Sequence, residues 1–250
     1  MRYFSAMPAD APATDDNICK TCEKPPALCV CDCVTPVDNR IAVVILRHPQ
    51  EQDRLLGTAR IAVLQLKSAA LKTGLSWPSL AKLVGQDVDP KRWGVLYLGT
   101  AKTLVTLRTD APLAPRPLTV VDKAGEALAD QDEILAGLEG IILLDGNWQQ
   151  AKALWWRNAW MLKCRRLLLQ PPRASYYGNL RKEPRGESVS TIEAAAYTLA
   201  ALAHDDTLAE KILPPFQRLL EKARAAKPEP KRDYRRRGSD GKPRRPQRAR

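Results

Sequence analysis

The stretch from Gly140 to Trp160, GIILLDGNWQQAKALWWRNAW, constrains the fold more than any other part of the chain. Residues 141–144 form a short, continuously apolar run, which is typical of a strand buried on both faces of a sheet. Asp145 ends this run, and Asn147 is a good N-cap for a helix that follows. Because ligands of open α/β sheets bind beyond the carboxyl ends of the strands, we expect the chemistry of this protein at Asp145 and in the turn after it.

The helix after this turn has two different faces. One face is apolar and should pack on the sheet, and it carries Trp148, Ala151, Leu154, Trp155, Ala159 and Leu162. On the opposite face Trp156 and Trp160 stand among polar and cationic residues, Gln149, Lys152 and Lys163. These two tryptophans either pack against another element or a second subunit, or they form a surface on which nucleic-acid bases stack.

Further apolar runs predict strands at 40–46, 93–98, 118–122 and 165–170. Helical spacing predicts helices at 54–70, 130–138 and 191–203, and a last helical segment at 207–226 that is broken by Pro214-Pro215. Strands that alternate with helices favour an α/β fold, with a mainly parallel sheet and helices on both faces.

Composition divides the chain into three parts. We expect an N-terminal segment with the cysteines at 1–39, an α/β domain at 40–226 and a disordered basic tail at 227–250. The tail has eleven Lys and Arg against three acids, so it carries +8 of the formal charge of +12. Such a tail either recruits a polyanion such as RNA or only improves solubility.

No apolar run approaches the length of a membrane helix, and the first residues lack the apolar core of a secretory signal. We therefore expect a cytoplasmic protein with no membrane partner. The sequence does not predict the oligomeric state.

Four cysteines within thirteen residues, Cys19, Cys22, Cys29 and Cys31, are the right number and type for a closed tetrahedral zinc site. In a cytoplasmic protein they are interpreted as thiols or metal ligands and not as disulfides. Cys33 competes with Cys31 as the last ligand. An iron–sulfur cluster, or unrelated free thiols, are the alternatives to zinc. A metal with four protein ligands has no open coordination position, so its role is expected to be structural.

His48 and Glu51 follow the predicted strand at 40–46. If this strand is parallel to the one that ends at Asp145, all three side chains lie at the same edge of the sheet. A histidine beside a glutamate at a strand end is either a structural pair or part of a catalytic site.

The polar segments after 170 have two features with chemical content. The loop at 173–187 holds several cations with Tyr176 and Tyr177 between them, the mixture expected where phosphates and splayed bases are held. Ser190 and Glu193 then form a capping box at the start of a helix. The N-terminus of that helix is also suited to an anion such as a carboxylate.

Together these motifs resemble the DTW-domain family. LDGNW at 144–148, followed by QQAKALWW, is similar to the strand-turn-helix of that family, with Asn147 in place of the threonine of Asp-Thr-Trp. Other family motifs follow in the family's order over roughly 19–203: the cysteines with Pro25, His-Pro-x-Glu at 48–51, Tyr177 with Leu180-Arg181 one residue further away than in the family, and Ser-Thr-x-Glu-Ala at 190–194. The family pattern also selects Cys31, and not Cys33, as the fourth ligand.

The resemblance implies a fold related to the knotted SPOUT methyltransferases, with a C-terminal trefoil knot near 173–193. It implies transfer of the 3-amino-3-carboxypropyl group of S-adenosylmethionine to N3 of a tRNA uridine, in the variable loop, with release of methylthioadenosine. A SPOUT-class RNA methyltransferase that uses S-adenosylmethionine and a non-enzymatic zinc-containing RNA-binding protein are the alternatives. N3 of uridine must lose its proton, so the reaction needs a carboxylate base. Asp145 is the first candidate for that base and Glu51 the second, with His48 beside them.

The resemblance also implies where the ligands bind. We expect S-adenosylmethionine at the strand ends and at the capping box, where the amides of Ser190 and Thr191 hold its carboxylate and Glu193 holds its ammonium group, unless the capping box uses Glu193 fully. The full set of expected cofactor-binding residues is Gly99, Leu144, Gly146, Asn147, Trp148, Ser190, Thr191 and Glu193. The expected RNA-binding residues are Lys152, Trp156, Arg173, Tyr177, Arg181 and Lys182.

Overall fold

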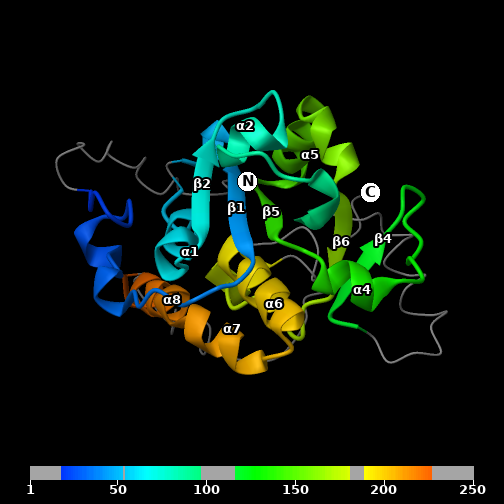
Figure 1. The fold of residues 1–250 in the computed structure, drawn as a ribbon. Coiled ribbons are helices and arrows are strands. Elements are labelled where there is room, and N and C mark those ends of the chain that lie inside the picture. The colour runs from blue at the N-terminus through cyan, green and yellow to red at the C-terminus, as the bar shows by residue number, and fades with distance from the viewer. Residues whose placement is uncertain (1–17, 53, 97–115, 181–188, 227–250) are drawn as a thin grey trace, which may run out of the picture.

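The computed structural model describes residues 18–52, 54–96, 116–180 and 189–226 (Figure 1). Gly99, Arg181, Lys182 and the basic tail lie outside the described residues. Six strands form one sheet: β1 (Ala42–Arg47), β2 (Ala69–Thr73), β3 (Trp93–Leu96), β4 (Leu118–Val121), β5 (Gly140–Asp145) and β6 (Arg165–Leu169). The α-helices of the described part are α1 (Ala59–Gln65), α2 (Leu80–Val84), α4 (Gln131–Ala136), α5 (Trp148–Arg157), α6 (Thr191–Ala203), α7 (Asp206–Ile212) and α8 (Pro214–Ala226).

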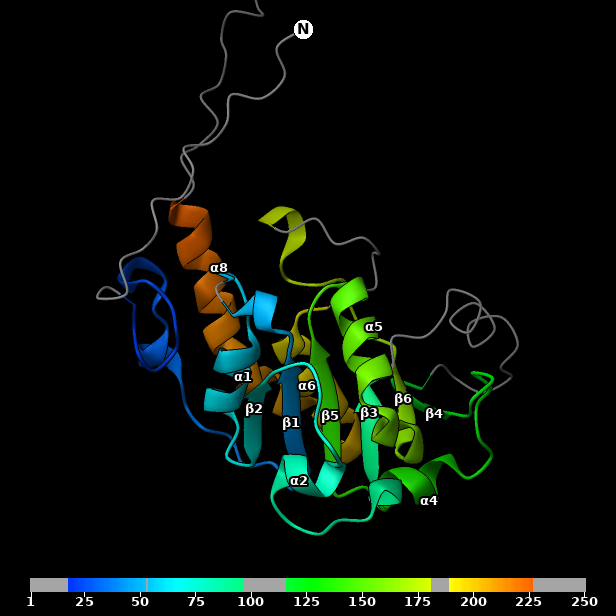
Figure 2. The ribbon, with the colours of Figure 1, turned by 90° about the horizontal axis from the view of Figure 1, so that it is seen from above.

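The strands lie in the order β2-β1-β5-β3-β6-β4 (Figure 2). Every neighbouring pair is parallel except β4 and β6, so the prediction of a mainly parallel sheet is confirmed. β5 is a central strand between β1 and β3, and its register with β1 pairs Asp145 with Arg47. The carboxyl ends of β1 and β5 therefore lie side by side, as the interpretation of His48 and Asp145 required.

Alternate residues of the strands feed two apolar cores, one on each face of the sheet. Val43 and Ile45 of β1 point to a core that they share with α1, α6, α7 and α8. Val44 and Leu46 point to the other core, where Leu154 of α5 and Leu80 of α2 pack. Figure 1 shows α6, α7 and α8 on one side of the sheet and α2 and α5 on the other. Burial on both faces explains the continuous apolar runs of β1 and β5.

Gly140 opens β5 because a side chain would not fit there. A Cβ atom at this position would lie 2.4 Å from the ring of Trp93, which fills the space beside it and is buried. The close approach of the glycine backbone thus lets the central strand pack against the largest side chain of this core.

The prediction of a single helix at 54–70 is wrong. The helical part is only α1, and the chain then extends into β2, which pairs with the outer edge of β1. Alanine, leucine and lysine in AALKT favour a helix locally, but hydrogen bonding to β1 overrides that preference. The short helix α2 was not predicted either.

The predicted apolar face of the helix after Asp145 is right only in its middle. Ala151 and Leu154 are buried, whereas Trp148 is 41% exposed and Leu162 is 50% exposed. The helix ends at Arg157, because Asn158 turns its side chain back to the carbonyl of Leu154. Residues beyond Asn158 therefore do not continue the helical face.

The two tryptophans of the opposite face have different environments. Trp160 is half-buried and its Nε1 donates to the carbonyl of Trp77 at 3.0 Å, so it packs within the chain. Trp156 is 71% exposed. Of these two tryptophans, only Trp156 is exposed enough for a nucleic-acid base to stack on it.

The remaining helices follow their predictions closely. α4 and α6 form where helices were expected, and Pro214 separates α7 from α8. No helix in the described part of the chain has the length and apolar character needed to cross a bilayer.

Candidate active site

Asp145 lies where three elements meet. It ends the central strand β5, its carbonyl accepts the amide of His48 at 3.0 Å, and its Oδ1 accepts a hydrogen bond of 2.5 Å from the Thr191 hydroxyl. Thr191 is the first residue of α6, so Asp145 faces the N-terminus of a 13-residue helix. The side chain is half-buried, which leaves it accessible while its orientation is fixed.

His48 and Glu51 occupy a 3-10 turn directly after β1. His48 Nδ1 accepts the amide of Gln50 at 3.3 Å, so this ring nitrogen acts as an acceptor within the turn. Glu51 is buried and lies 3.6 Å from Arg54. The structure brings both residues to the edge that holds Asp145, but it encloses Glu51 more fully.

The turn between β5 and α5 is tightly built. Asn147 and Gln150 form a capping box, and the Gln150 side chain also donates to Gln50 at 3.3 Å. A Cβ atom at Gly146 would lie 2.8 Å from Cβ of Gln150, so only glycine fits this approach. The exposed Trp148 follows at the first helical position.

The capping box at the start of α6 is confirmed, and it uses most of the amides there. Ser190 N donates to Glu193 Oε2, Ile192 N donates to Thr58 Oγ1, and Glu193 N donates to Ser190 Oγ. The amide of Thr191 donates to no other described residue. Of the two amides expected to bind a carboxylate, Ser190 is thus already engaged and Thr191 is available.

Glu193 is a structural residue here, which corrects its expected role as the holder of the cofactor's ammonium group. Its side chain is completely buried. Oε1 accepts the amide of Tyr176 at 2.8 Å, and Oε2 accepts Ser190 N and the Ser175 hydroxyl, both at 2.7 Å. The carboxylate therefore fastens the loop after β6 to the start of α6.

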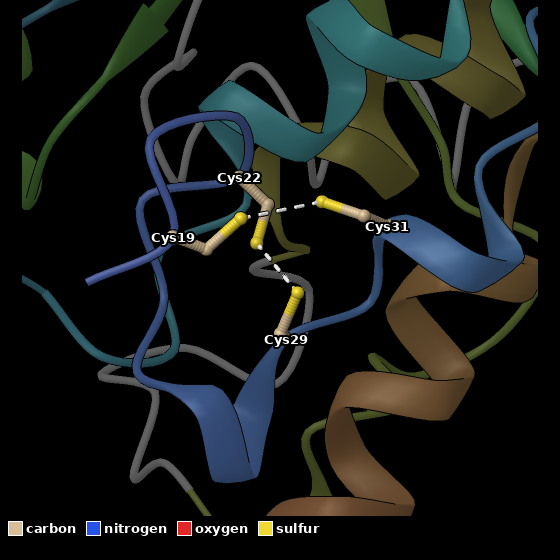
Figure 3. A group of neighbouring side chains, drawn as sticks. All are labelled: Cys19, Cys22, Cys29 and Cys31. Carbon is tan, nitrogen blue, oxygen red and sulfur yellow. Dashed lines mark hydrogen bonds between the residues drawn. The ribbon is translucent and has the colours of Figure 1, made fainter. Parts of the chain in front are cut away.

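The four cysteines of the N-terminal segment converge on one point (Figure 3). Their sulfur atoms all lie within 4.8 Å of one another, with Cys19 and Cys31 at 3.6 Å and Cys22 and Cys29 at 3.6 Å. Tetrahedral zinc with Zn–S bonds of about 2.3 Å separates its sulfurs by about 3.8 Å, so the cluster suits this ion. Cys33 is not part of the cluster.

The acid–base properties of these thiols also suit a cation. Hydrogen bonds from the backbone amides of Cys22 and Thr21 lower the pKa of Cys19 to about 6. Burial, together with hydrogen bonding to the other thiols, raises the pKa of Cys31. Four thiols this close cannot all ionise by themselves, and a divalent cation at their centre removes that obstacle.

The cysteine segment is attached to the carboxyl edge of the sheet by Glu23. This residue has a left-handed φ of 57° in the turn after Cys22, and its carboxylate lies 2.8 Å from the buried Arg47 guanidinium. Arg47 also donates to Thr73 of β2 at 3.1 Å. Glu23 thus ties the cysteine turn to the register partner of Asp145.

Lys24, the next residue, was missed by the sequence analysis. Its side chain is buried, and its ammonium group donates to the carbonyl of Arg54 at 3.0 Å. Burial lowers the pKa of Lys24 to about 8, and nearby negative groups, Asp145 among them, act in the opposite direction. A lysine between Cys22 and Pro25 has no sequence signature, because its burial depends on segments that are distant in the chain.

The expected RNA-binding residues separate into two classes. Lys152, Trp156 and Arg173 are exposed, and the Arg173 guanidinium stacks 4.8 Å from the ring centre of Tyr176. Tyr177 is only 1% exposed, which contradicts a role in base stacking. Its hydroxyl donates to the carbonyl of Leu56 at 2.6 Å, and its ring packs edge-on against Phe216. The ring of Tyr177 is therefore part of the apolar core and is not available to stack on a base.

The model of the DTW domain family matches residues 16–224, which include the cysteine cluster, the sheet and most of α8. The chain belongs to the DTW-domain family. No solved structure matches the chain.

Three relatives of this DTW-domain chain carry the name tRNA-uridine aminocarboxypropyltransferase 2. The protein of Macaca fascicularis is 25% identical over 219 residues, which are 83% of this chain and 64% of the relative. The protein of Mus musculus is 26% identical over 80% of this chain and 61% of the relative, and that of Drosophila melanogaster is 26% identical over 84% and 76%. The chain thus spans less than two thirds of the length of the two mammalian relatives.

Metal analysis of the purified protein is expected to find one zinc ion per chain. Cys31→Ser should lose the ion, whereas Cys33→Ser is the matched control and should keep it, because Cys33 lies outside the cluster. Since a structural zinc site contributes directly to folding, zinc removal should also make the segment at 18–33 sensitive to proteases. Iron in the site, or zinc lost from Cys33→Ser alone, would contradict this assignment.

Proposed function

We propose that this DTW-domain chain transfers the 3-amino-3-carboxypropyl group of S-adenosylmethionine to N3 of a uridine in the variable loop of tRNA, in the cytoplasm. The names of the three relatives support the reaction class. The observation that carries the proposal is Asp145, an accessible carboxylate at the end of the central strand that the Thr191 hydroxyl holds in place.

The reaction needs one base and one oriented electrophile. S-adenosylmethionine supplies the carbon: the N3–C bond forms as the C–S bond breaks, the bonding electrons stay on sulfur, and methylthioadenosine leaves uncharged. The N3 proton passes to a carboxylate of the enzyme, which we assign to Asp145. Glu51 is the second candidate, but its burial beside Arg54 makes it less accessible to uridine.

The choice of the aminocarboxypropyl carbon over the methyl carbon depends on how the donor is held. We propose that the donor lies along the carboxyl ends of β1 and β5, against Leu144, Gly146, Asn147 and Trp148. The Thr191 amide, at the positive end of α6, suits its carboxylate. We propose that His48, which follows the neighbouring strand β1, also lines the site.

We propose that tRNA reaches Asp145 across the exposed face of α5. Lys152 and Trp156 offer a cation and a stacking surface there, and Arg173 adds a second cation. On this proposal the chain divides into a cysteine segment at 1–39, a catalytic domain at 40–226 and a tail at 227–250 that recruits tRNA.

Removal of 227–250 is expected to weaken tRNA binding and to flatten its dependence on salt, because the tail carries a net +8. Turnover at saturating tRNA should hardly change, since the tail recruits the substrate and performs no chemistry. Binding titrations at several salt concentrations, with turnover measured at saturation, test this. A truncated protein that loses turnover at saturation would place the tail in the site.

We also propose a SPOUT-related fold in which the segment near 173–193 is threaded as a trefoil knot. The strand order supports this. β3 lies between β6 and β5, yet the chain that follows β6 comes back to the end of β5, where Thr191 bonds Asp145. True knots are nearly absent from proteins, so an experimental backbone trace is required. A segment that lies outside the loop would refute the knot.

The decisive test is a reaction of purified protein with tRNA and S-adenosylmethionine. Nucleoside mass spectrometry should find an aminocarboxypropyl group on uridine, and the by-product should be methylthioadenosine. S-adenosylhomocysteine as the by-product would instead indicate a methyltransferase. Failure to bind S-adenosylmethionine would favour an RNA-binding protein without catalytic activity.

A further inference from the structure

We infer that Lys24, delivered to the site by the cysteine turn, binds the α-carboxylate of S-adenosylmethionine and so selects the amino-acid end of the donor. This rests on the proposed function. It assigns to the cysteine segment a role in substrate recognition beyond its fold.

The first observation is that the buried ammonium group of Lys24 has few partners. Lys24 is 4% exposed, yet among the described residues its ammonium group donates a single hydrogen bond, to Arg54 O, and forms no ion pair. An ammonium has three donors, and the negative groups that favour this buried charge, Cys22, Glu23 and Asp145, do so without a direct ion pair, so a close counter-ion is still missing. A ligand that is anionic and approaches from the site satisfies both requirements.

The second observation is where the charge lies. A Cβ atom at Gly57 would lie 3.9 Å from the Lys24 nitrogen, so the ammonium group packs on the loop at 54–57. The next residue, Thr58, accepts the amide of Ile192 at 3.2 Å, and Thr191 bonds Asp145. One short path of contacts therefore joins Lys24 to the N-terminus of α6 and to the strand end.

A second path reaches the same place from the other side. Glu23 precedes Lys24 and holds Arg47, the register partner of Asp145. This ion pair engages the Arg47 charge, whereas Lys24, with no ion pair among the described residues, can meet a ligand. With the Thr191 amide across the strand end, Lys24 gives the site two groups that favour a carboxylate.

Binding of two ligands tests this without any catalysis. Native protein is expected to bind S-adenosylmethionine at least about 10-fold more tightly than decarboxylated S-adenosylmethionine, which lacks only the carboxylate. In Lys24→Met, affinity for S-adenosylmethionine should fall about 10- to 100-fold, while affinity for the decarboxylated compound stays the same or rises. Lys24→Arg keeps the charge and should keep a preference. Lys67→Met, at an exposed lysine paired with Asp38, is the matched control and should bind as native protein does.

Several results would overturn the inference. Equal affinity of native protein for both compounds would do so without any variant. Lys24→Met could instead fold and still prefer S-adenosylmethionine over the decarboxylated compound, with or without loss of zinc. Lys24 would then only neutralise the thiolates and would not bind the donor. Weaker tRNA binding with the preference unchanged would assign the anion to an RNA phosphate. In all three cases S-adenosylmethionine still binds, whereas no binding by native protein would refute the proposed function itself.

Discussion

Asp145→Asn is expected to reduce transfer to uridine by about 100- to 10,000-fold, the usual contribution of a general base. Asparagine keeps the size of the side chain and can still accept the Thr191 hydroxyl, but it cannot take up the N3 proton. S-adenosylmethionine and tRNA should therefore bind with near-normal affinity, and the loss should appear in turnover. Single-turnover rates and equilibrium binding of the same variant measure the two effects separately.

Two further measurements sharpen this prediction. Asp132→Asn removes an exposed carboxylate of α4 that pairs with Arg116, and the turnover of this variant should remain native. Raising the pH ionises more of the uridine in solution, so Asp145→Asn should partly recover. Native turnover in Asp145→Asn at neutral pH would exclude Asp145 as the base and favour Glu51.

Glu193→Ala is expected to lower the free energy of unfolding by at least about 3 kcal/mol. The carboxylate is completely buried and accepts three hydrogen bonds, from Ser175, Tyr176 and Ser190. Each buried donor left without an acceptor costs about 1 to 3 kcal/mol. Urea unfolding of native and mutant protein measures the difference.

Glu210→Ala, at an exposed position of α7, is the matched control and should change stability by less than about 0.5 kcal/mol. If Glu193→Ala instead unfolds like native protein and specifically loses affinity for S-adenosylmethionine, then Glu193 contacts the donor and is not a structural residue.

The sequence by itself determined the features that depend on neighbours in the chain. The cysteine-rich segment at 19–33 predicts a four-thiol cluster, although the family pattern was needed to choose Cys31 over Cys33, and the local pattern around Ser190 sets the capping box. The apolar run before Asp145 required a strand buried on both faces, which placed this residue at the carboxyl edge of a sheet. In each case a few consecutive residues carry both the signal and the structure.

Tertiary structure decided which side chains are buried and what they contact. The sequence pattern predicted that Tyr177 contacts RNA. In the structure its hydroxyl donates to the carbonyl of Leu56 and its ring packs against Phe216. Trp148 matched an apolar helix face, but the core below α5 begins only at Ala151. Lys24 had no signal at all, since its environment comes from the loop at 54–57. Burial depends on segments that are far apart in the chain, and neither periodicity nor motif spacing records those contacts.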